Sequence, residues 1–197
     1  MPSWQKTEIF FKFHIMLKKI VFLDRDGVIN KDSPEYIKNW NEFEFIPGSI
    51  EAIRRLTAAG FAVILITNQS GIGRGIIAPE DLADMHTKMQ EKIRAHGGEI
   101  CDIFFCPHCP DENCDCRKPK PGLIWHAQKK YSIDLSSAWM IGDSAKDIEC
   151  AISAGCGHHI LVQTGNGIAA EKILAEKGIT PLYVEKNLLT AAERILF

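Results

Sequence analysis

Three aspartates stand directly after apolar runs in this sequence. Asp24 and Asp26 lie one residue apart in FLDRDGVIN, and Asp143 ends the run SAWMIGD. Carboxylates gathered at one place repel each other strongly unless a cation joins them, and an all-oxygen ligand set favours Mg²⁺. A carboxylate beside Mg²⁺ and a phosphate can attack phosphorus and form an aspartyl-phosphate intermediate. The three residues therefore predict magnesium-dependent phosphoryl transfer.

Four further side chains could stabilise such a reaction. Negative charge builds on the equatorial oxygens of a phosphoryl group during transfer, so hydrogen-bond donors and cations must converge there. Thr67 offers a hydroxyl, Asn68 an amide, and the pair Arg117 and Lys118 in CDCRKPKPG offers positive charge. On an extended strand, the second carboxylate of FLDRDGVIN would lie on the same face as the first, about 6–7 Å further along. It could then reach the leaving oxygen.

The segment CPHCPDENCDC, residues 106–116, contains five side chains that bind transition metals. A closed structural zinc site takes four ligands. Two sets of four ligands are possible, and both contain Cys106, Cys114 and Cys116. The fourth ligand is His108 in one set and Cys109 in the other, and geometry alone does not choose between them. Four of the seven cysteines of the chain lie in this segment, which fits a metal loop better than a disulfide framework. We predict a structural zinc that orders this loop.

Alternating strand and helix patterns must bring these residues together. Short apolar runs predict strands, and apolar residues at helical spacing predict the helices between them. The predicted strands lie in 19–24, 61–67, 99–106, 137–143, 158–164 and 181–184. The predicted helices lie in 46–61 (N-cap Ser49), 79–98, 121–131, 144–156 (N-cap Ser144), 168–177 and 187–197. Repeated units of this kind predict an α/β fold, a Rossmann-like, doubly wound parallel sheet with helices on both faces.

The polar candidates fall at the carboxyl ends of the predicted strands. Ligands of doubly wound sheets bind outside those ends, near the point where the strand order reverses. Asp24 and Asp26 follow the first strand, Thr67 and Asn68 the second, Cys106 and His108 the third, and Asp143 the fourth. Scattered surface polarity would not select the same end of four strands, so we expect one shared site.

Four stretches resemble, in the same order, the motifs of the haloacid dehalogenase (HAD) superfamily. FLDRDGVIN is similar to D-x-D-G-[TV], and ILITNQSG is similar to the apolar strand that ends in threonine. CRKPKPG resembles the motif that carries the lysine, and MIGDSAKD resembles G-D-x-x-x-D. The resemblance covers residues 20–165, and it implies the HAD fold and a phosphatase.

The resemblance also implies a role for each matched residue. Asp24 would be the nucleophile, and Asp26 would be the general acid for the leaving group and then the base for water. Thr67 and Lys118 would hold the phosphoryl oxygens.

The metal ligands are implied in the same way. Mg²⁺ would bind the Asp24 carboxylate, the backbone carbonyl of Asp26 and the carboxylate of Asp143. Asp147 would either support the site at one remove or be a charge on a helix face.

The spacing of the motifs leaves no room for a cap domain. Only 42 residues separate Asp24 from Thr67 and 50 separate Thr67 from Lys118, and predicted elements use most of them. The spacing C-x-H…C-x-C resembles a capless HAD subfamily that acts on heptose bisphosphates and histidinol phosphate. By that resemblance the zinc ligands are Cys106, His108, Cys114 and Cys116, and Cys109 is spare.

Within that subfamily, LDRDGVIN, FEFIPG, TNQSGIGRG and CDCRKPKPG most resemble enzymes that remove the 7-phosphate of D-glycero-D-manno-heptose 1,7-bisphosphate for lipopolysaccharide precursors. The resemblance implies substrate contacts at Asp32, Tyr36, Asn68, Gln69, Ser70 and Arg117. The planar fork of Arg117 suits a second phosphate. Histidinol phosphate is the alternative substrate. An inactive, zinc-stabilised binding module is the alternative of another class, and the presence of both Asp24 and Asp26 argues against it.

Several other side chains have simpler interpretations. Arg25 could contact a substrate phosphate or form a structural salt bridge. His86 is expected at a helix surface, facing solvent or the edge of the core. Cys101, Cys150 and Cys156 are expected to be small buried apolar residues.

The chain has 197 residues, a formal charge of -2 and 46% apolar residues. This composition suits one domain with a sizeable core and indicates neither a nucleic-acid nor a membrane partner. We expect residues 1–17 to be an extension outside the fold, with Met16 as an alternative start, and residues 18–197 to form one phosphatase domain. The sequence shows no signal-peptide pattern, so the cytoplasm is the expected compartment. The absence of a cap and of an obvious apolar patch favours a monomer, and the resemblance implies a small phosphorylated sugar as the substrate.

Overall fold

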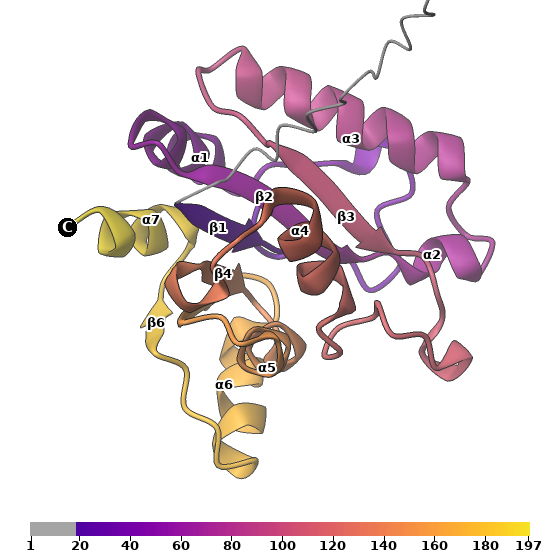
Figure 1. Cartoon of the computed structure of the whole chain (residues 1–197). Coiled ribbons are helices and arrows are strands. Elements are labelled where there is room, and N and C mark those ends of the chain that lie inside the picture. The colour runs from indigo at the N-terminus through magenta and orange to yellow at the C-terminus, as the bar shows by residue number, and fades with distance from the viewer. Residues whose placement is uncertain (1–18) are drawn as a thin grey trace, which may run out of the picture.

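A six-stranded parallel sheet forms the centre of the computed structural model, which describes residues 19–197 (Figure 1). The strands are β1 (Ile20–Leu23), β2 (Ala62–Asn68), β3 (Asp102–Cys106), β4 (Trp139–Gly142), β5 (His158–Val162) and β6 (Tyr183–Glu185). Every neighbouring pair among these strands is parallel. The predicted doubly wound α/β fold is confirmed.

The strand order is β3-β2-β1-β4-β5-β6. The chain builds outward from β1 in one direction and then from β4 in the other, so the order reverses between these two central strands. Ligands of such sheets bind at the carboxyl ends beside this reversal. Asp24 follows β1 and Asp143 follows β4, so two predicted site residues flank the reversal point.

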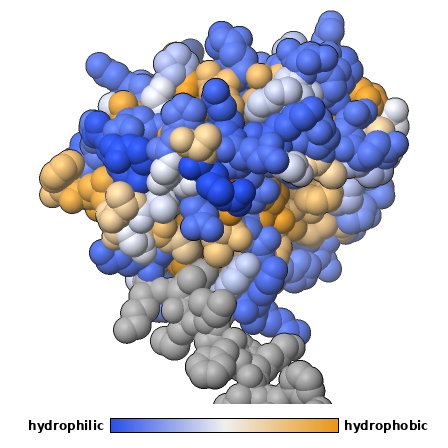
Figure 2. All heavy atoms as spheres, turned by 90° about the horizontal axis from the view of Figure 1, so that it is seen from above, coloured by the Kyte–Doolittle hydropathy of each residue, from blue (hydrophilic) through white to orange (hydrophobic). Residues whose placement is uncertain are grey.

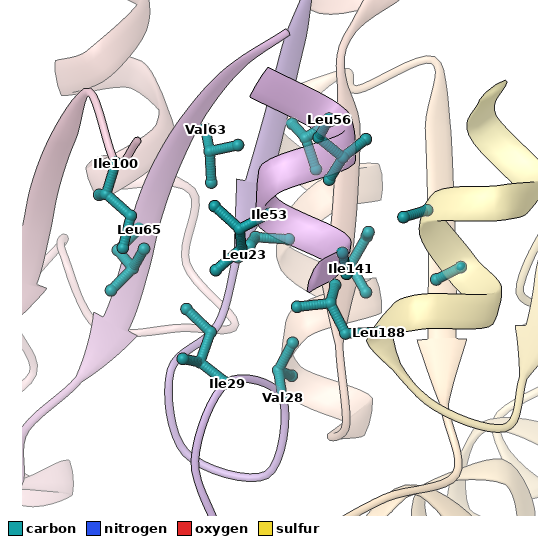
Figure 3. Close-up of a cluster of buried hydrophobic side chains, with 14 of the residues drawn as sticks. Leu23, Val28, Ile29, Ile53, Leu56, Val63, Leu65, Ile100, Ile141 and Leu188 are labelled. Atoms are coloured by element: carbon teal, nitrogen blue, oxygen red, sulfur yellow. The ribbon is translucent and has the colours of Figure 1, made fainter. Parts of the chain in front are cut away.

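Helices cover both faces of the sheet, as Figure 1 shows. One face carries α1 (Ser49–Ala58), α3 (Pro79–Arg94) and α7 (Leu188–Leu196), and the other carries α4 (Gly122–Tyr131), α5 (Ala145–Ala154) and α6 (Gly167–Glu176). The first group packs on the inward side chains of β1 and β2, such as Leu23 and Leu65 (Figure 3). Because β1 and β2 are covered on both sides, their residues are apolar at consecutive positions.

Two local predictions are wrong. Ser49 is the first residue of α1 and not its cap, since Gly48 takes the cap position with a φ of 87°. This left-handed conformation favours glycine, so Gly48 starts the helix without a side-chain cap. Cys101 is exposed, because it lies just before β3, a strand at the edge of the sheet. Cys150 and Cys156 are buried as predicted.

The connections after β1 and β2 are short. The first holds a 3-10 turn (Trp40–Glu42) and α1, and the second holds α2 (Ser70–Gly73) and α3. Within residues 19–197, therefore, no cap domain is inserted at either point. The predicted extension, residues 1–17, lies outside the described residues.

The surface seen in Figure 2 is mostly hydrophilic, and its hydrophobic side chains lie in small groups. Over the described part of the chain, none of the helices has the length and apolar character needed to cross a membrane.

Candidate active site

A cleft of about 570 Å³ opens at the carboxyl ends of the strands. The predicted catalytic and substrate-binding residues that line it are Asp24, Asp26, Asp32, Tyr36, Thr67, Asn68, Gln69, Arg117, Lys118 and Asp143. These residues come from the ends of β1, β2 and β4 and from the loops after β1 and β3, which are distant in the sequence. Ser70 is the exception, because it is buried at the start of α2 and does not line the cleft.

Lys118 lies between two carboxylates at the floor of the cleft. Its Nζ is 3.0 Å from Asp24 Oδ1 and 2.5 Å from Asp147 Oδ1. Lys118 is 2% exposed and Asp147 is fully buried. Burial lowers the pKa of a lysine, but here Asp147 and Asp24 outweigh burial and raise the pKa of Lys118. Asp147 therefore pairs directly with the site lysine, and it also caps α5 by accepting hydrogen bonds from Ser144.

Asp143 is enclosed by backbone on two sides. A Cβ atom added to Gly27 or to Gly165 would lie 2.0 or 2.1 Å from its Oδ2, and both glycines have positive φ angles. The backbone N–H of Asn166 donates to the same oxygen at 2.8 Å. Only glycine permits this close approach of two loops to one carboxylate. The loops after β1 and β5 thus hold Asp143 in place, in addition to its own strand, β4.

The carboxylates of Asp24, Asp143 and Asp147 offer oxygen atoms within 4.8 Å of one another. Burial is the main cause that raises the pKa of Asp24 to about 7, and Asp147 and Asp26 add to it against the opposing charge of Lys118. Burial, Asp24 and Asp147 raise the pKa of Asp143 to about 8.

One lysine does not neutralise three carboxylates, of which Asp143 and Asp147 are buried and Asp24 is half-buried. A hard divalent cation on Asp24 and Asp143 fits this excess of negative charge and this oxygen-only donor set. Both oxygens of Asp147 have partners, Oδ1 with Lys118 and Oδ2 with Ser144. Lys118 contacts only Oδ1 of Asp24, so Asp24 and Asp143 are the more available ligands.

Asp26 lies apart from this carboxylate cluster and accepts hydrogen bonds from three side chains. Arg25 donates from Nε and Nη2 at 2.8–3.1 Å, Asn30 Nδ2 donates at 2.8 Å and Gln69 Nε2 donates at 2.9 Å. Burial alone would raise the pKa of Asp26, but Arg25, Asn30 and Gln69 together hold it below the usual value. Arg25 thus forms a salt bridge, which was one of its two predicted interpretations.

The end of β2 supplies the next wall of the cleft. Gln69 Nε2 donates to Thr67 Oγ1 at 3.0 Å as well as to Asp26, so its buried amide joins these two residues. Asn68 donates to the carbonyl of Lys118 and accepts from its backbone N–H, both at 3.1 Å. Asn68 and Gln69 therefore hold other site residues in place, a function that the sequence pattern did not indicate.

Asp32, Tyr36 and Arg117 lie at the rim of the cleft. Asp32 Oδ2 accepts a hydrogen bond from Asn166 Nδ2 at 3.0 Å, which links the loop after β1 to the start of α6. Arg117 Nη1 donates to the carbonyl of His108 at 3.2 Å. Asn166 was not predicted, although it follows β5 and the strand-end rule that identified the other residues applies to it as well.

The predicted metal loop gathers four ligands. The Sγ atoms of Cys106, Cys114 and Cys116 lie 3.2–3.5 Å apart, and Nδ1 of His108 is 3.3–3.5 Å from two of them. Zinc–sulfur bonds of about 2.3 Å give a tetrahedron with edges of about 3.8 Å, close to these separations. Cys109 is outside the group, so the structure favours the set that contains His108.

The comparisons with known proteins agree with this geometry. A family model described as HAD-hydrolase-like matches residues 115–191. A D-glycero-beta-D-manno-heptose-1,7-bisphosphate 7-phosphatase of Pseudomonas aeruginosa is 48% identical over 153 residues, 78% of this chain and 85% of that protein. A protein of the same name from Pseudomonas putida is 47% identical over 161 residues, 82% of this chain and 89% of that protein.

A solved structure is also similar. The crystal structure of D,D-heptose 1,7-bisphosphate phosphatase from B. bronchiseptica, complexed with magnesium and phosphate, has a TM-score of 0.85 and 42% identity. The alignment covers 90% of this chain and 98% of that chain.

Proposed function

Because this chain belongs to the HAD-like family of the heptose 1,7-bisphosphate phosphatases, we propose that it removes the 7-phosphate of D-glycero-β-D-manno-heptose 1,7-bisphosphate. That it is a phosphatase follows from its family, and the sugar substrate is the proposal. The anomer is taken from the names of the relatives. We also propose that residues 18–197 act as one monomeric, cytoplasmic domain.

In the proposed mechanism Asp24 attacks phosphorus and forms an aspartyl-phosphate. The bond from phosphorus to the sugar oxygen breaks, and Asp26 gives its proton to that oxygen. Asp26, now a carboxylate, takes a proton from water as the water oxygen attacks phosphorus of the aspartyl-phosphate. The bond from phosphorus to Asp24 breaks, which releases inorganic phosphate, restores the Asp24 carboxylate and returns Asp26 to its protonated form. The two aspartates have separate surroundings, since Asp24 lies against Lys118 and Asp26 lies against Arg25. Arg25 lowers the pKa of Asp26 in the free protein, so we propose that the negative charge of the bound phosphate raises this pKa and protonates Asp26.

Three groups would bind the phosphoryl oxygens during both steps. Thr67 offers its hydroxyl, and Lys118 brings a buried positive charge that Asp24 and Asp147 hold in place. Mg²⁺, bound by Asp24, Asp143 and the backbone carbonyl of Asp26, would neutralise the carboxylates and draw negative charge onto the phosphoryl oxygens. Donors fixed before the reaction stabilise developing charge without reorganisation.

The outer part of the cleft would hold the sugar and its second phosphate. Arg117 lies at this rim with one nitrogen bonded to a backbone carbonyl and with the rest of its guanidinium fork open to a ligand. Asp32 and Tyr36 stand on the opposite loop, where an acceptor and a phenol suit sugar hydroxyls. We therefore propose that Arg117 binds the anomeric phosphate.

The observation that carries this proposal is the convergence of the predicted residues on one cleft in a chain with close heptose-bisphosphatase relatives. Phosphate release should be measured in Mg²⁺ with heptose 1,7-bisphosphate and with histidinol phosphate. We expect kcat/KM to be at least about 10³-fold higher for the bisphosphate, because only it engages the second anionic subsite. Equal and feeble rates on both compounds would contradict the assignment, and a preference for histidinol phosphate would replace it.

The predicted magnesium site has a pH-dependent effect on stability. A carboxyl group whose pKa is raised by folding costs stability as pH rises from its unfolded value toward its folded value. Asp24 and Asp143 have pKa values raised to about 7 and about 8. The metal-free protein should therefore lose thermal stability between pH 5.5 and pH 8. Mg²⁺ at about 100 times its Kd should raise Tm by about 5–10 °C at pH 8 and by much less at pH 5.5.

Thermal unfolding with Mg²⁺ and with EDTA at the two pH values tests this prediction. Asp143→Asn should abolish most of the Mg²⁺ effect and raise the Tm of the metal-free protein at pH 8, because it removes one of the repelling charges. A Mg²⁺ effect of equal size at both pH values would show that these carboxyls are not the ligands.

The zinc proposal has a matched pair of variants. Cys116→Ser should lose the bound zinc and lower kcat/KM by about 10–100-fold, because Arg117 and Lys118 follow the lost ligand directly. Cys109→Ser should keep about one zinc per chain and near-normal activity, since its thiol lies outside the ligand group. Metal analysis of reduced protein by mass spectrometry checks both, and zinc loss from the Cys109 variant would favour the four-cysteine set.

A further inference from the structure

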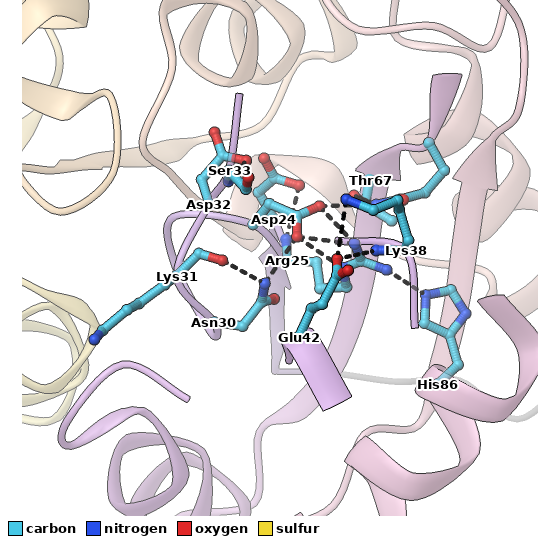
Figure 4. Close-up of polar contacts among 12 residues, drawn as sticks. Asp24, Arg25, Asn30, Lys31, Asp32, Ser33, Lys38, Glu42, Thr67 and His86 are labelled. Atoms are coloured by element: carbon cyan, nitrogen blue, oxygen red, sulfur yellow. Dashed lines mark hydrogen bonds and ion pairs between the residues drawn. The ribbon is translucent and has the colours of Figure 1, made fainter. Parts of the chain in front are cut away.

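Arg25 is a charged residue that is almost completely buried. It is 1% exposed and lies at the end of β1 between the two aspartates of the motif. Burying an unpaired guanidinium is costly, so its surroundings must satisfy its hydrogen-bond donors. Figure 4 shows the side chain extending from β1 toward His86 on α3.

The guanidinium makes two sets of contacts. Nε and Nη2 donate to the carboxylate of Asp26 at 2.8–3.1 Å, and Nη1 lies 3.4 Å from Nε2 of His86. No side-chain contact joins the Arg25 guanidinium to Asp24 within the described residues; only the backbone N–H of Arg25 donates to Asp24, at 2.7 Å. The guanidinium is thus directed to Asp26 and not to the nucleophile.

His86 holds the side of the Arg25 guanidinium that does not contact Asp26. Arginine is a donor only, so Nε2 of His86 must be the unprotonated acceptor, and the ring is neutral with its proton on Nδ1. His86 is buried, and its ring packs edge-on against Phe105 at 6.0 Å between centroids. Because His86 is neutral, it accepts a hydrogen bond from Nη1 but does not form a second ion pair with Arg25. The ion pair between Arg25 and Asp26 is therefore not weakened.

The two oxygens of Asp26 are not equivalent. Oδ1 accepts from Nε and Nη2 of Arg25 and from Asn30, and Oδ2 accepts from Nη2 of Arg25 and from Gln69. Oδ1 accepts hydrogen bonds from three donor atoms, whereas Oδ2 accepts from two and has more capacity for a further contact. Gln69 also bonds Thr67, which lines the cleft, so Oδ2 is the oxygen on the side of the reacting phosphate.

We propose that Arg25, supported by His86, is a positioning residue that fixes Asp26 so that its Oδ2 transfers the proton. The inference rests on the proposed function, in which Asp26 protonates the sugar oxygen as its bond to phosphorus breaks. A general acid works only within hydrogen-bond reach of its target, and small misplacements are costly. The bidentate contact removes the rotation about the last side-chain bond that would misplace Oδ2.

Substrates with different leaving groups separate this role from a structural one. The leaving group of a sugar phosphate is a strongly basic alkoxide, which needs the proton from Asp26. The leaving group of p-nitrophenyl phosphate is a stable phenolate, which hardly needs that proton. Misplacing Asp26 should therefore slow the first reaction much more than the second, whereas damage to the nucleophile, the metal site or the fold should slow both.

The experiment compares kcat/KM of Arg25→Met on heptose 1,7-bisphosphate and on p-nitrophenyl phosphate in Mg²⁺. We expect a loss of about 10²–10³-fold on the sugar phosphate, the usual range for general acid catalysis, and of less than about tenfold on the aryl phosphate. Arg54→Met, which removes an exposed arginine from α1, is the matched control and should change neither rate.

His86 provides a second test that does not depend on the folding of the Arg25 variant. His86→Leu removes the acceptor and should slow the sugar phosphate alone, by about 3–10-fold. His86→Gln, whose amide oxygen can accept from Arg25, should recover most of that loss. Equal losses on both substrates in folded Arg25→Met, or identical rates for the leucine and glutamine variants, would overturn the proposal. Wild-type protein that hydrolyses neither compound would instead contradict the proposed function.

Discussion

Asp24→Asn is expected to lower kcat on any phosphomonoester by about 10⁴-fold or more, the range seen when a nucleophile is removed from other enzymes. Asparagine keeps the size of the side chain but cannot form the acyl phosphate. It also removes one of the two carboxylates that flank Lys118. The residual rate should be equally low for sugar and aryl phosphates, because both need the nucleophile.

Acid quenching during turnover provides the direct measurement. Wild-type protein given labelled substrate should retain label on the chain as an acid-stable acyl phosphate, and Asp24→Asn should retain none. Asp84→Asn is a suitable control, since Asp84 is exposed on α3 and pairs only with Lys88 one turn away. Full turnover by the Asp24 variant would exclude this residue as the nucleophile.

Much of the site could be predicted because of where the buried strands end. β1 and β2 are covered on both faces, so their sequences are apolar at consecutive positions and the first polar residue marks the end of each strand. Parallel strands place those ends on one edge of the sheet. Asp24, Thr67 and Asp143 were therefore predictable as neighbours without knowledge of how the helices pack.

The contacts that sequence reasoning missed depend on helix packing and loop geometry. His86 reaches Arg25 across 61 residues of sequence, and nothing local shows that α3 turns this ring toward the site. On the sequence it occupies the apolar stripe with Leu82 and Met89, where a histidine has no distinguishing signal. The amide of Gln69 likewise looks available for substrate until the structure shows it bonded to Asp26 and Thr67.

The loop with the four candidate metal ligands and the cleft are connected through one short segment. Cys116, Arg117 and Lys118 are consecutive, and both amide hydrogen bonds of Asn68 hold the backbone of Lys118. A metal ion in the loop would thus fix the segment from one side while β2 fixes it from the other. This arrangement supplies, without a cap domain, a fixed position for Lys118, the one lysine of residues 19–197 that pairs with Asp24.

Lys118→Met should therefore destabilise the fold as well as slow the reaction. The substitution leaves Asp24 and Asp147 without their cation in a buried place, and losing one partner of a buried ion pair costs about 3–5 kcal/mol. Without Lys118, which opposes the effect of burial, the pKa of Asp24 should rise further, so more of the nucleophile is protonated at neutral pH. We expect kcat to fall by about 10²–10³-fold, the loss typical for a group that stabilises transition-state charge.

Urea unfolding of a double-mutant cycle tests the reason for this loss. Asp147→Asn should lower the free energy of unfolding much less in the Lys118→Met background than in the wild type, because the carboxylate is already unpaired there. We expect a coupling free energy between the two substitutions of at least about 1 kcal/mol. Lys120→Met is the control, since Lys120 lies two residues further on, pairs with the exposed Asp115, and should matter by about 0.5 kcal/mol or less. Additive losses in the cycle would mean that Lys118 contributes through packing of its methylene stem. In that case the charge balance at the cleft floor would have to come from the metal alone.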